Sequence, residues 1–130
     1  MDLAVRHRYP QPGNEDEFED FCVRFYRQLL KRGGLVRYAK RGEKQDGIDI
    51  IDQLAVKPLF AIQCKHHETA KTIPPKEIKN EVALAESSSH PIDHYIIATT
   101  AKKSKNAHDT VLELNQTNGG SRRFNIEIHF

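Results

Sequence analysis

The sequence predicts an α/β fold in which helices flank a mixed central sheet. Three segments carry apolar residues at helical spacing, and five others are short runs of strand-like character. In chain order these elements read α-β-β-β-α-β-α-β, which is typical of a sheet layered between helices. A length of 130 residues suits one domain with a substantial core, and not two domains.

The first helix is expected to begin after Asn14, because an asparagine at that position caps free N–H groups of the first turn. Residues 15–17 are all acidic, which favours the same helix end through its dipole, and Glu17 completes a capping-box pattern. One apolar stripe follows: Phe18, Phe21, Cys22, Phe25 and Leu29. Basic residues and glycines at 31–34 end the helix, and residues 1–13 form a polar lead-in.

The remaining elements follow from shorter patterns. A second helix is expected to start near Pro74 or Pro75, with Ile78, Val82 and Ala85 on its inner face, and a third to cover about residues 106–116. The expected strands are residues 35–41, 47–52, 58–65, 92–100 and 123–130.

The composition is that of a globular protein, with 38% apolar residues, 29% charged residues and a net charge of +2. A surface for nucleic acid must therefore be a local basic patch. Cys22 and Cys64 lie in apolar patterns without zinc-site spacing, so we expect two buried free thiols; a disulfide is the alternative. No apolar run approaches the ~20 residues that span a bilayer, and the N-terminus lacks a signal-peptide pattern, so we expect a cytoplasmic protein without a membrane partner.

Two neighbouring strands place polar groups where a core has no use for them. If residues 47–52 pair antiparallel with 58–65, Asp49 lies opposite Gln63, and Gly47 opposite Lys65, where it would leave room for a ligand. The alternation then assigns Asp49, Gln63 and Lys65 to one face. The apolar face would comprise Ile48, Ile50, Phe60, Ile62 and Cys64. The alternative is that Asp49 and Lys65 form a structural ion pair on a half-solvated sheet.

Glu19 is a further acidic candidate on the first helix. It lies about 100° around the helix from Phe18 and borders the apolar stripe beside Cys22 and Tyr26, so it can point toward the rim of the sheet. A solvated position on an amphipathic helix is the alternative.

These residues resemble a known family. "FEDF" on the first helix, "GEKQDGID" before a strand and "AIQCK" on the next strand resemble the restriction-endonuclease-like (PD-(D/E)XK) nucleases, and most closely the Mrr-type variants that carry Gln in the motif. The archaeal Holliday-junction resolvases share the same plan. The order of elements matches the αβββαβ core of that superfamily, and the resemblance extends from about Glu15 to Ile128.

The resemblance implies a role for each motif residue. Asp49 would be the principal Mg²⁺ ligand, the backbone carbonyl of Cys64 would complete the metal shell, and Glu19 would bind or orient a second ion or its water. Gln63 replaces the more frequent carboxylate, so metal binding without phosphate should be weaker; Mn²⁺ is a possible substitute for Mg²⁺. Lys65 would contact the attacking water or the scissile phosphate.

The resemblance also implies a biological setting. Such domains often stand at the N-terminus of bacterial antiviral defence proteins, fused to a sensor or ATPase module. We therefore expect residues 14–130 to form a single nuclease domain of a longer protein, assembled as a homodimer or higher oligomer; a complete small protein is the alternative.

Several basic or hydroxyl side chains are candidates for DNA contact. The segment at 99–105 follows a strand and opens a helix, where hydroxyls and lysines suit a phosphate-binding loop; a solvated lysine run is the alternative. The candidates are Thr99, Thr100, Lys102, Lys103, Lys105, Lys40 and Arg41. His66 and His67 are adjacent on a strand, face opposite ways and cannot bind one ion together.

The function expected from this combination is a Mg²⁺-dependent endonuclease that hydrolyses phosphodiester bonds in double-stranded DNA. Glu19, Asp49, Gln63 and Lys65 are its expected catalytic residues. One alternative is a catalytically weak DNA-binding module of the same fold, and another is a nuclease for RNA or branched DNA.

Overall fold

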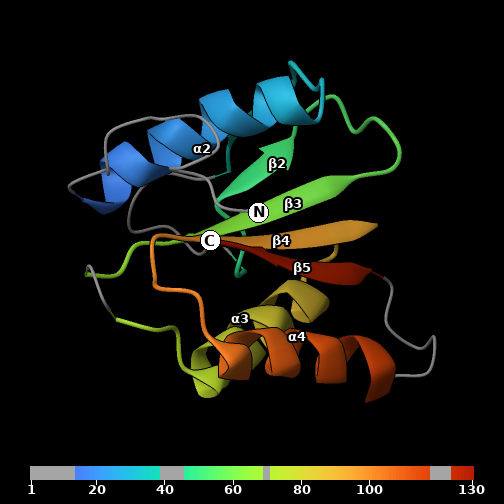
Figure 1. Ribbon diagram of the computed structural model, residues 1–130. Helices are drawn as coiled ribbons and strands as arrows, with labels where there is room; N and C mark the ends of the chain where they lie inside the picture. The colour runs from blue at the N-terminus through green and yellow to red at the C-terminus, as the bar shows by residue number, and fades with distance from the viewer. Residues whose placement is uncertain (1–13, 39–45, 69–70, 118–123) are drawn as a thin grey trace.

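The computed structural model describes residues 14–38, 46–68, 71–117 and 124–130. The described elements follow the predicted order of one helix, three strands, and then alternating helices and strands (Figure 1). They are α2 (Glu15–Leu29), β1 (Leu35–Arg37), β2 (Ile50–Asp52), β3 (Phe60–Lys65), α3 (Pro75–Ser87), β4 (His94–Thr99), α4 (Lys105–Thr117) and β5 (Asn125–His129). β1 and β2 are shorter than the sequence predicts. Among these helices, none has the length and apolar character needed to cross a membrane.

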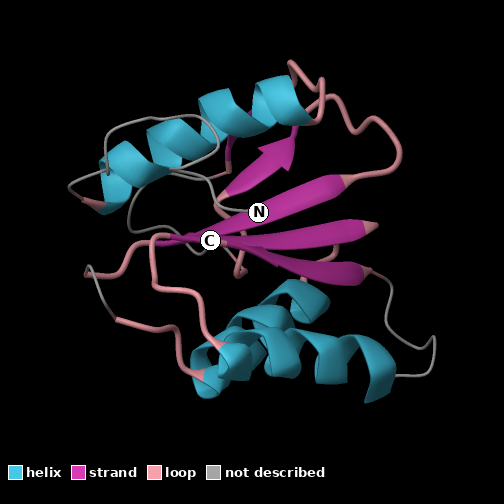
Figure 2. Ribbon diagram, in the orientation of Figure 1, coloured by secondary structure: helices cyan, strands magenta, loops and turns pink. Residues whose placement is uncertain are grey.

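The five strands form one mixed sheet in the order β1-β2-β3-β4-β5. β1, β2 and β3 pair antiparallel, whereas β3, β4 and β5 are parallel and are joined through α3 and α4. Helix α2 covers one face of the sheet, and α3 and α4 cover the other (Figure 2). The predicted α/β class, with helices flanking a mixed sheet, is confirmed.

Helix α2 begins as the sequence predicts. The side-chain oxygen of Asn14 accepts a hydrogen bond from the N–H of Glu17 at 2.8 Å, which satisfies one of the free donors of the first turn. The apolar stripe then turns toward the sheet, where Phe18, Cys22 and Tyr26 are almost completely buried. Local capping and spacing therefore determine both the start of this helix and the face that it buries.

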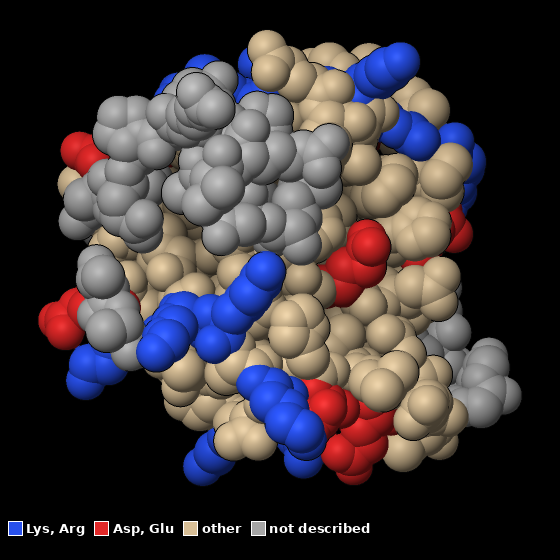
Figure 3. Space-filling model, viewed as in Figure 1, with Lys and Arg blue, Asp and Glu red and all other residues tan. Residues whose placement is uncertain are grey.

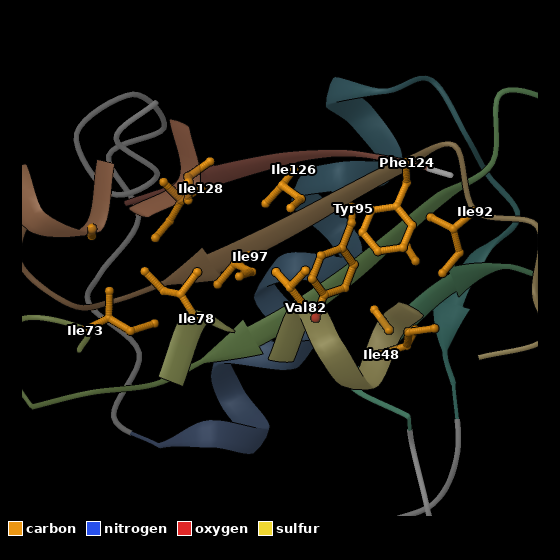
Figure 4. Close-up of a cluster of buried hydrophobic side chains, with 14 of the residues drawn as sticks. Ile48, Ile73, Ile78, Val82, Ile92, Tyr95, Ile97, Phe124, Ile126 and Ile128 are labelled. Carbon is orange, nitrogen blue, oxygen red and sulfur yellow. The ribbon is translucent and has the colours of Figure 1, made fainter. Parts of the chain in front are cut away.

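Each face of the sheet has its own apolar core. The α2 side contains Ile50, Ile62, Cys64, Ile96 and Ala98. The α3–α4 side contains Ile48, Ala61, Tyr95, Ile97 and Ile126, with Val82 of α3 packed against them (Figure 4). β3 therefore divides its residues by alternation: Ile62 and Cys64 lie toward α2, whereas Ala61 lies toward α3.

The prediction that Ile48 and Ile50 share a face is wrong. The register Ile50↔Ile62 is the predicted one, but the N–H of Asp49 also donates to the carbonyl of Ile62, at 2.9 Å. Two residues thus oppose one, as in a β-bulge, and the alternation changes phase at Asp49. Ile48 consequently packs toward α3, and the regular pairing that would place Asp49 opposite Gln63 does not extend past Ile50.

Gly47 packs against a helix and does not open a ligand path beside Lys65, so that prediction is also wrong. Its φ is +72°, and a Cβ placed on it would lie 2.8 Å from the backbone oxygen of Glu81 and 2.9 Å from the Cβ of Leu84. The hydroxyl of Tyr95 donates to the carbonyl of Gly47 at 2.6 Å and reaches that of Glu81 at 3.4 Å. A glycine is required here because the turn and α3 approach backbone to backbone.

We expect Gly47→Ala to lower the free energy of unfolding by roughly 2 kcal/mol or more, because alanine is strained at this φ and its methyl group meets the backbone of α3. Urea denaturation followed by circular dichroism measures the change. Gly33→Ala is the matched control: nothing lies within 4 Å of a Cβ at Gly33, so a change within about 0.5 kcal/mol is expected. Equal losses in the two variants would contradict the assigned contact.

Candidate active site

The candidate residues meet where the bulge before β2 lies beside the last residues of β3. The N–H of Cys64 donates to Oδ2 of Asp49 at 2.8 Å, so the carboxylate occupies a place that a neighbouring backbone carbonyl takes in a regular ladder. Asp49 is only 4% exposed. The bulge therefore fixes a buried carboxylate against the edge of β3.

Asp49 lies in surroundings that disfavour its negative charge. Burial raises the pKa of its carboxyl group from 3.8 to about 7, the hydrogen bond from Cys64 opposes the shift, and the charges of Glu19 and Glu15 add to it. Lys65 lowers the pKa again, but it is the smallest of these causes. Such a group is stabilised as an anion when a cation binds beside it.

Gln63, the residue before Cys64 on β3, carries a second buried oxygen. Its side chain is 7% exposed, and among the described residues its Oε1 accepts no hydrogen bond. A buried amide oxygen without a partner is costly, and a bound cation is one way to satisfy it. An unpartnered amide oxygen of this kind fits a divalent metal, which prefers oxygen ligands.

The backbone of Cys64 completes this oxygen-rich edge. In a strand the N–H and the C=O of one residue point to the same neighbour, so the carbonyl of Cys64 faces the side on which its N–H meets Asp49. Cys22 and Cys64 are both free and buried, as predicted. Burial raises the pKa of the Cys64 thiol, with contributions from Cys22 and Asp49, so this thiol stays protonated.

Glu19 lies on the predicted side of α2, facing the rim of the sheet, and is 8% exposed. Its Oε1 is 3.3 Å from a guanidinium nitrogen of Arg37, at the end of β1. Arg37 also contacts Asp16 at 3.1 Å and Asp20 at 3.5 Å. Burial raises the pKa of Glu19 although Arg37 opposes the shift. The solvated alternative for Glu19 is therefore excluded.

Lys65 is held by α3. Its Nζ lies 2.8 Å from Oε1 of Glu81 and 3.8 Å from Oε1 of Glu77, and among the described residues no ion pair joins it to Asp49. Burial acts to lower the pKa of Lys65, but its bond to Glu81 and the nearby carboxylates outweigh burial and raise it. The alternative of a structural Asp49–Lys65 ion pair is thus not what the structure contains.

Glu81 and Glu77 were not predicted from the sequence. They are four residues apart on α3, and each directly precedes a buried residue, Ile78 or Val82. This spacing beside the buried face is the sequence pattern that could have indicated them. His67 joins this acidic face, with Nε2 at 3.1 Å from Oε2 of Glu77. Within the described part of the chain, no three His, Cys, Asp or Glu residues are arranged to hold a metal. Amide and carbonyl oxygens of β3 are the further oxygen atoms near the Asp49 carboxylate that a metal could use.

The segment after β4 supports the end of β3. The hydroxyl of Thr99 donates to the carbonyl of Lys65 at 2.7 Å, and Thr100 donates to the carbonyl of His67 at 2.9 Å. Thr99 is 1% exposed, so the structure gives this residue an internal contact in place of the predicted surface position. The two hydroxyls hold the chain that carries Lys65.

The predicted lysines are at the surface. Lys102, Lys103 and Lys105 are exposed, and Lys105 pairs with Asp109 at 2.6 Å. Lys40 and Arg41 lie outside the described residues. On the face seen in Figure 3, basic side chains form several small groups near acidic ones, in keeping with the net charge of +2.

One comparison with known families gives a match that covers most of the chain. A family model described as "Restriction endonuclease" (Mrr_cat_2) matches residues 25–126. The matched region contains Asp49, Gln63, Lys65 and Glu81, whereas Glu19 precedes it. Neither the curated proteins nor the solved structures contain a significant match to this chain.

We expect Asp49→Asn to stabilise the metal-free protein at pH 8 but not near pH 4. The folded state keeps the Asp49 proton up to about pH 7 and the unfolded state releases it near 3.8, so the free energy of unfolding falls as the pH rises through this window. Asparagine carries no charge and escapes the loss, while its side-chain oxygen can still accept from Cys64.

Urea denaturation in EDTA between pH 4 and pH 8 measures this difference. Asp109→Asn is the control, because it makes the same substitution at an exposed carboxylate on α4. A difference from the wild type that stays constant with pH for Asp49→Asn would show that burial does not shift the ionisation of Asp49 in the folded protein.

Proposed function

This chain belongs to the Mrr-type restriction endonuclease family, and we propose that it is a metal-dependent nuclease that hydrolyses phosphodiester bonds in double-stranded DNA. The observation that carries the proposal is the buried Asp49 carboxylate held by the N–H of Cys64, and the buried, unpartnered side-chain oxygen of the preceding residue, Gln63, supports it. A buried carboxylate and a buried amide oxygen without a protein donor are the kind of ligands that suit a bound Mg²⁺ or Mn²⁺.

We assign the proposed metal to oxygen atoms from the bulge and from β3. Asp49 would provide the carboxylate, with the amide oxygen of Gln63 and the carbonyl of Cys64 beside it, and Glu19 would bind a second ion or its water. When bound, the metal polarises the phosphate and lowers the pKa of a water ligand. Because Gln63 is neutral, binding should strengthen when the phosphate of the substrate adds negative charge.

The protein's own groups would orient the substrate. The ammonium of Lys65, at the end of β3, would donate to the scissile phosphate or the attacking water and so stabilise the charge that develops in the transition state. Thr99 supports this role, because its bond to the carbonyl of Lys65 fixes the strand end that carries the ammonium. Positions held by backbone contacts need little rearrangement at the moment of reaction.

We expect Asp49→Asn and Lys65→Ala to lower the rate of plasmid cleavage by roughly 10²-fold or more, the range found for single groups that stabilise transition-state charge. Supercoiled plasmid with Mg²⁺ and gel electrophoresis measure the rate, and EDTA should abolish it. Asp109→Asn and Lys57→Ala are matched controls, since both side chains are more than half exposed and pair with other residues.

The outcomes separate the competing functions. Cutting that survives the substitution of Asp49 or Lys65 would remove these residues from the site. Retained binding without cutting by the wild type would favour a DNA-binding module of the same fold. Faster cutting of RNA or of a four-way junction than of plasmid would instead favour a nuclease for RNA or branched DNA.

We further propose that Lys102 and Lys103 contact the phosphate backbone. Both are exposed and follow β4, whose last residue Thr99 pairs with Lys65 in the sheet. DNA that reaches Lys65 would therefore pass near them. Lys105 is less available, because it pairs with Asp109.

We expect Lys102→Ala and Lys103→Ala each to weaken DNA binding and to reduce the slope of log K against log[salt] by about 0.9 for every phosphate contact that is lost. Fluorescence anisotropy in EDTA over a range of salt concentrations measures both quantities without cleavage. Lys57→Ala, at the opposite end of β3, should leave the slope unchanged. An unaltered slope in all three variants would place the phosphates elsewhere.

Family resemblance also supports a setting for the domain. We propose that residues 14–130 act as one nuclease domain in bacterial antiviral defence, as a homodimer that cuts both strands. Light scattering of the chain with and without DNA tests the dimer, and a monomer under both conditions would contradict it.

A further inference from the structure

Among the described residues, the contact between Lys65 and Glu81 is the shortest ion pair at the candidate site. Nζ and Oε1 are 2.8 Å apart, and the side chains are 21% and 12% exposed. A free lysine side chain loses rotamer entropy when it is fixed, so it samples many positions unless a partner holds it. Glu81 supplies such a partner, and it comes from a helix outside the sequence motif.

Glu81 is itself held in place by the turn that precedes Asp49. Its backbone oxygen lies against Gly47, where a Cβ would come within 2.8 Å. The hydroxyl of Tyr95 bonds the carbonyl of Gly47 and reaches the carbonyl of Glu81. The same helical residue therefore touches the Asp49 turn through its backbone and Lys65 through its side chain.

Glu77 is farther from Lys65 than Glu81 is, and its carboxylate also pairs with another residue. Its Oε1 is 3.8 Å from the ammonium of Lys65, and its other oxygen lies 3.1 Å from His67. It is one helical turn from Glu81, carries the same charge and is more exposed, at 27%. A comparison of variants at Glu81 and Glu77 therefore distinguishes the effect of the short contact with Lys65 from a general effect of negative charge on α3.

We propose that Glu81 is a positioning residue: its carboxylate holds the ammonium of Lys65 at a set distance from Asp49, so that a phosphate bound at the bulge meets both groups. This inference rests on the proposed nuclease function. Through Glu81, α3 couples the two halves of the site, the turn before β2 and the end of β3.

Steady-state kinetics on plasmid DNA test the inference. Glu81→Ala should lower kcat about tenfold or more and change KM little, because substrate binding is retained while the ammonium is misplaced. Glu81→Gln keeps an oxygen acceptor of the same reach and should lose less. Glu77→Gln should lower kcat at most about threefold. Thermal unfolding confirms that each variant is folded under the assay conditions.

A double-mutant cycle assigns the effect to Lys65. In the Lys65→Ala background, Glu81→Ala should change kcat less than about twofold, because the group that it positions is absent. An undiminished loss in that background, or a rise in KM alone, overturns the inference and leaves the proposed function intact.

A second cycle is independent of cleavage. Glu81→Ala and Lys65→Ala should be non-additive in the midpoint of urea unfolding, since each removes the same ion pair. Additive midpoints show that Glu81 does not hold Lys65 in solution, and they overturn the inference alone. A wild-type protein that cuts no nucleic acid overturns the proposed function together with this role for Glu81, even where the midpoints are non-additive.

Discussion

The hydrogen bond from the N–H of Cys64 to the carboxylate of Asp49 is the contact on which the candidate site depends. It replaces a regular ladder bond at the point where β2 departs from β3, and so places an anion in the plane of the sheet. The bulge that permits it also turns Ile48 to the opposite face from Ile50. One local irregularity therefore arranges the core and the site together.

Burial gives this carboxylate its chemical character. Asp49 has no ion-pair partner among the described residues, whereas Glu19 is paired with Arg37 and Lys65 with Glu81. Both cations are thus engaged by carboxylates other than Asp49, and the side-chain oxygen of Gln63, the residue before Cys64, is buried without a partner among the described residues. A neutral Gln63 adds no repulsion around a carboxylate that is already difficult to ionise, which suits the proposed cation site.

The two layers of helices bring different groups to the sheet. Helix α2 packs on the face of Ile62 and Cys64 and brings Glu19 to the rim, whereas α3 packs on the face of Ala61 and brings Glu81 to Lys65. The apolar stripes of these helices determine which of their polar residues reach the site. Packing and chemistry are consequently linked, because a rotation of either helix would move an acidic group as well as a core side chain.

Local patterns in the sequence were sufficient to determine the cap at Asn14, the buried stripe of α2, the order of elements and the register Ile50↔Ile62. They were sufficient because the helical period, the strand period and capping act over a few neighbouring residues. Only the tertiary structure decided that Gly47 packs against α3, that the alternation shifts at Asp49 and that Glu81 holds Lys65. Each of these depends on the approach of segments that are distant in the chain, and the spacing of residues along one segment does not determine that approach.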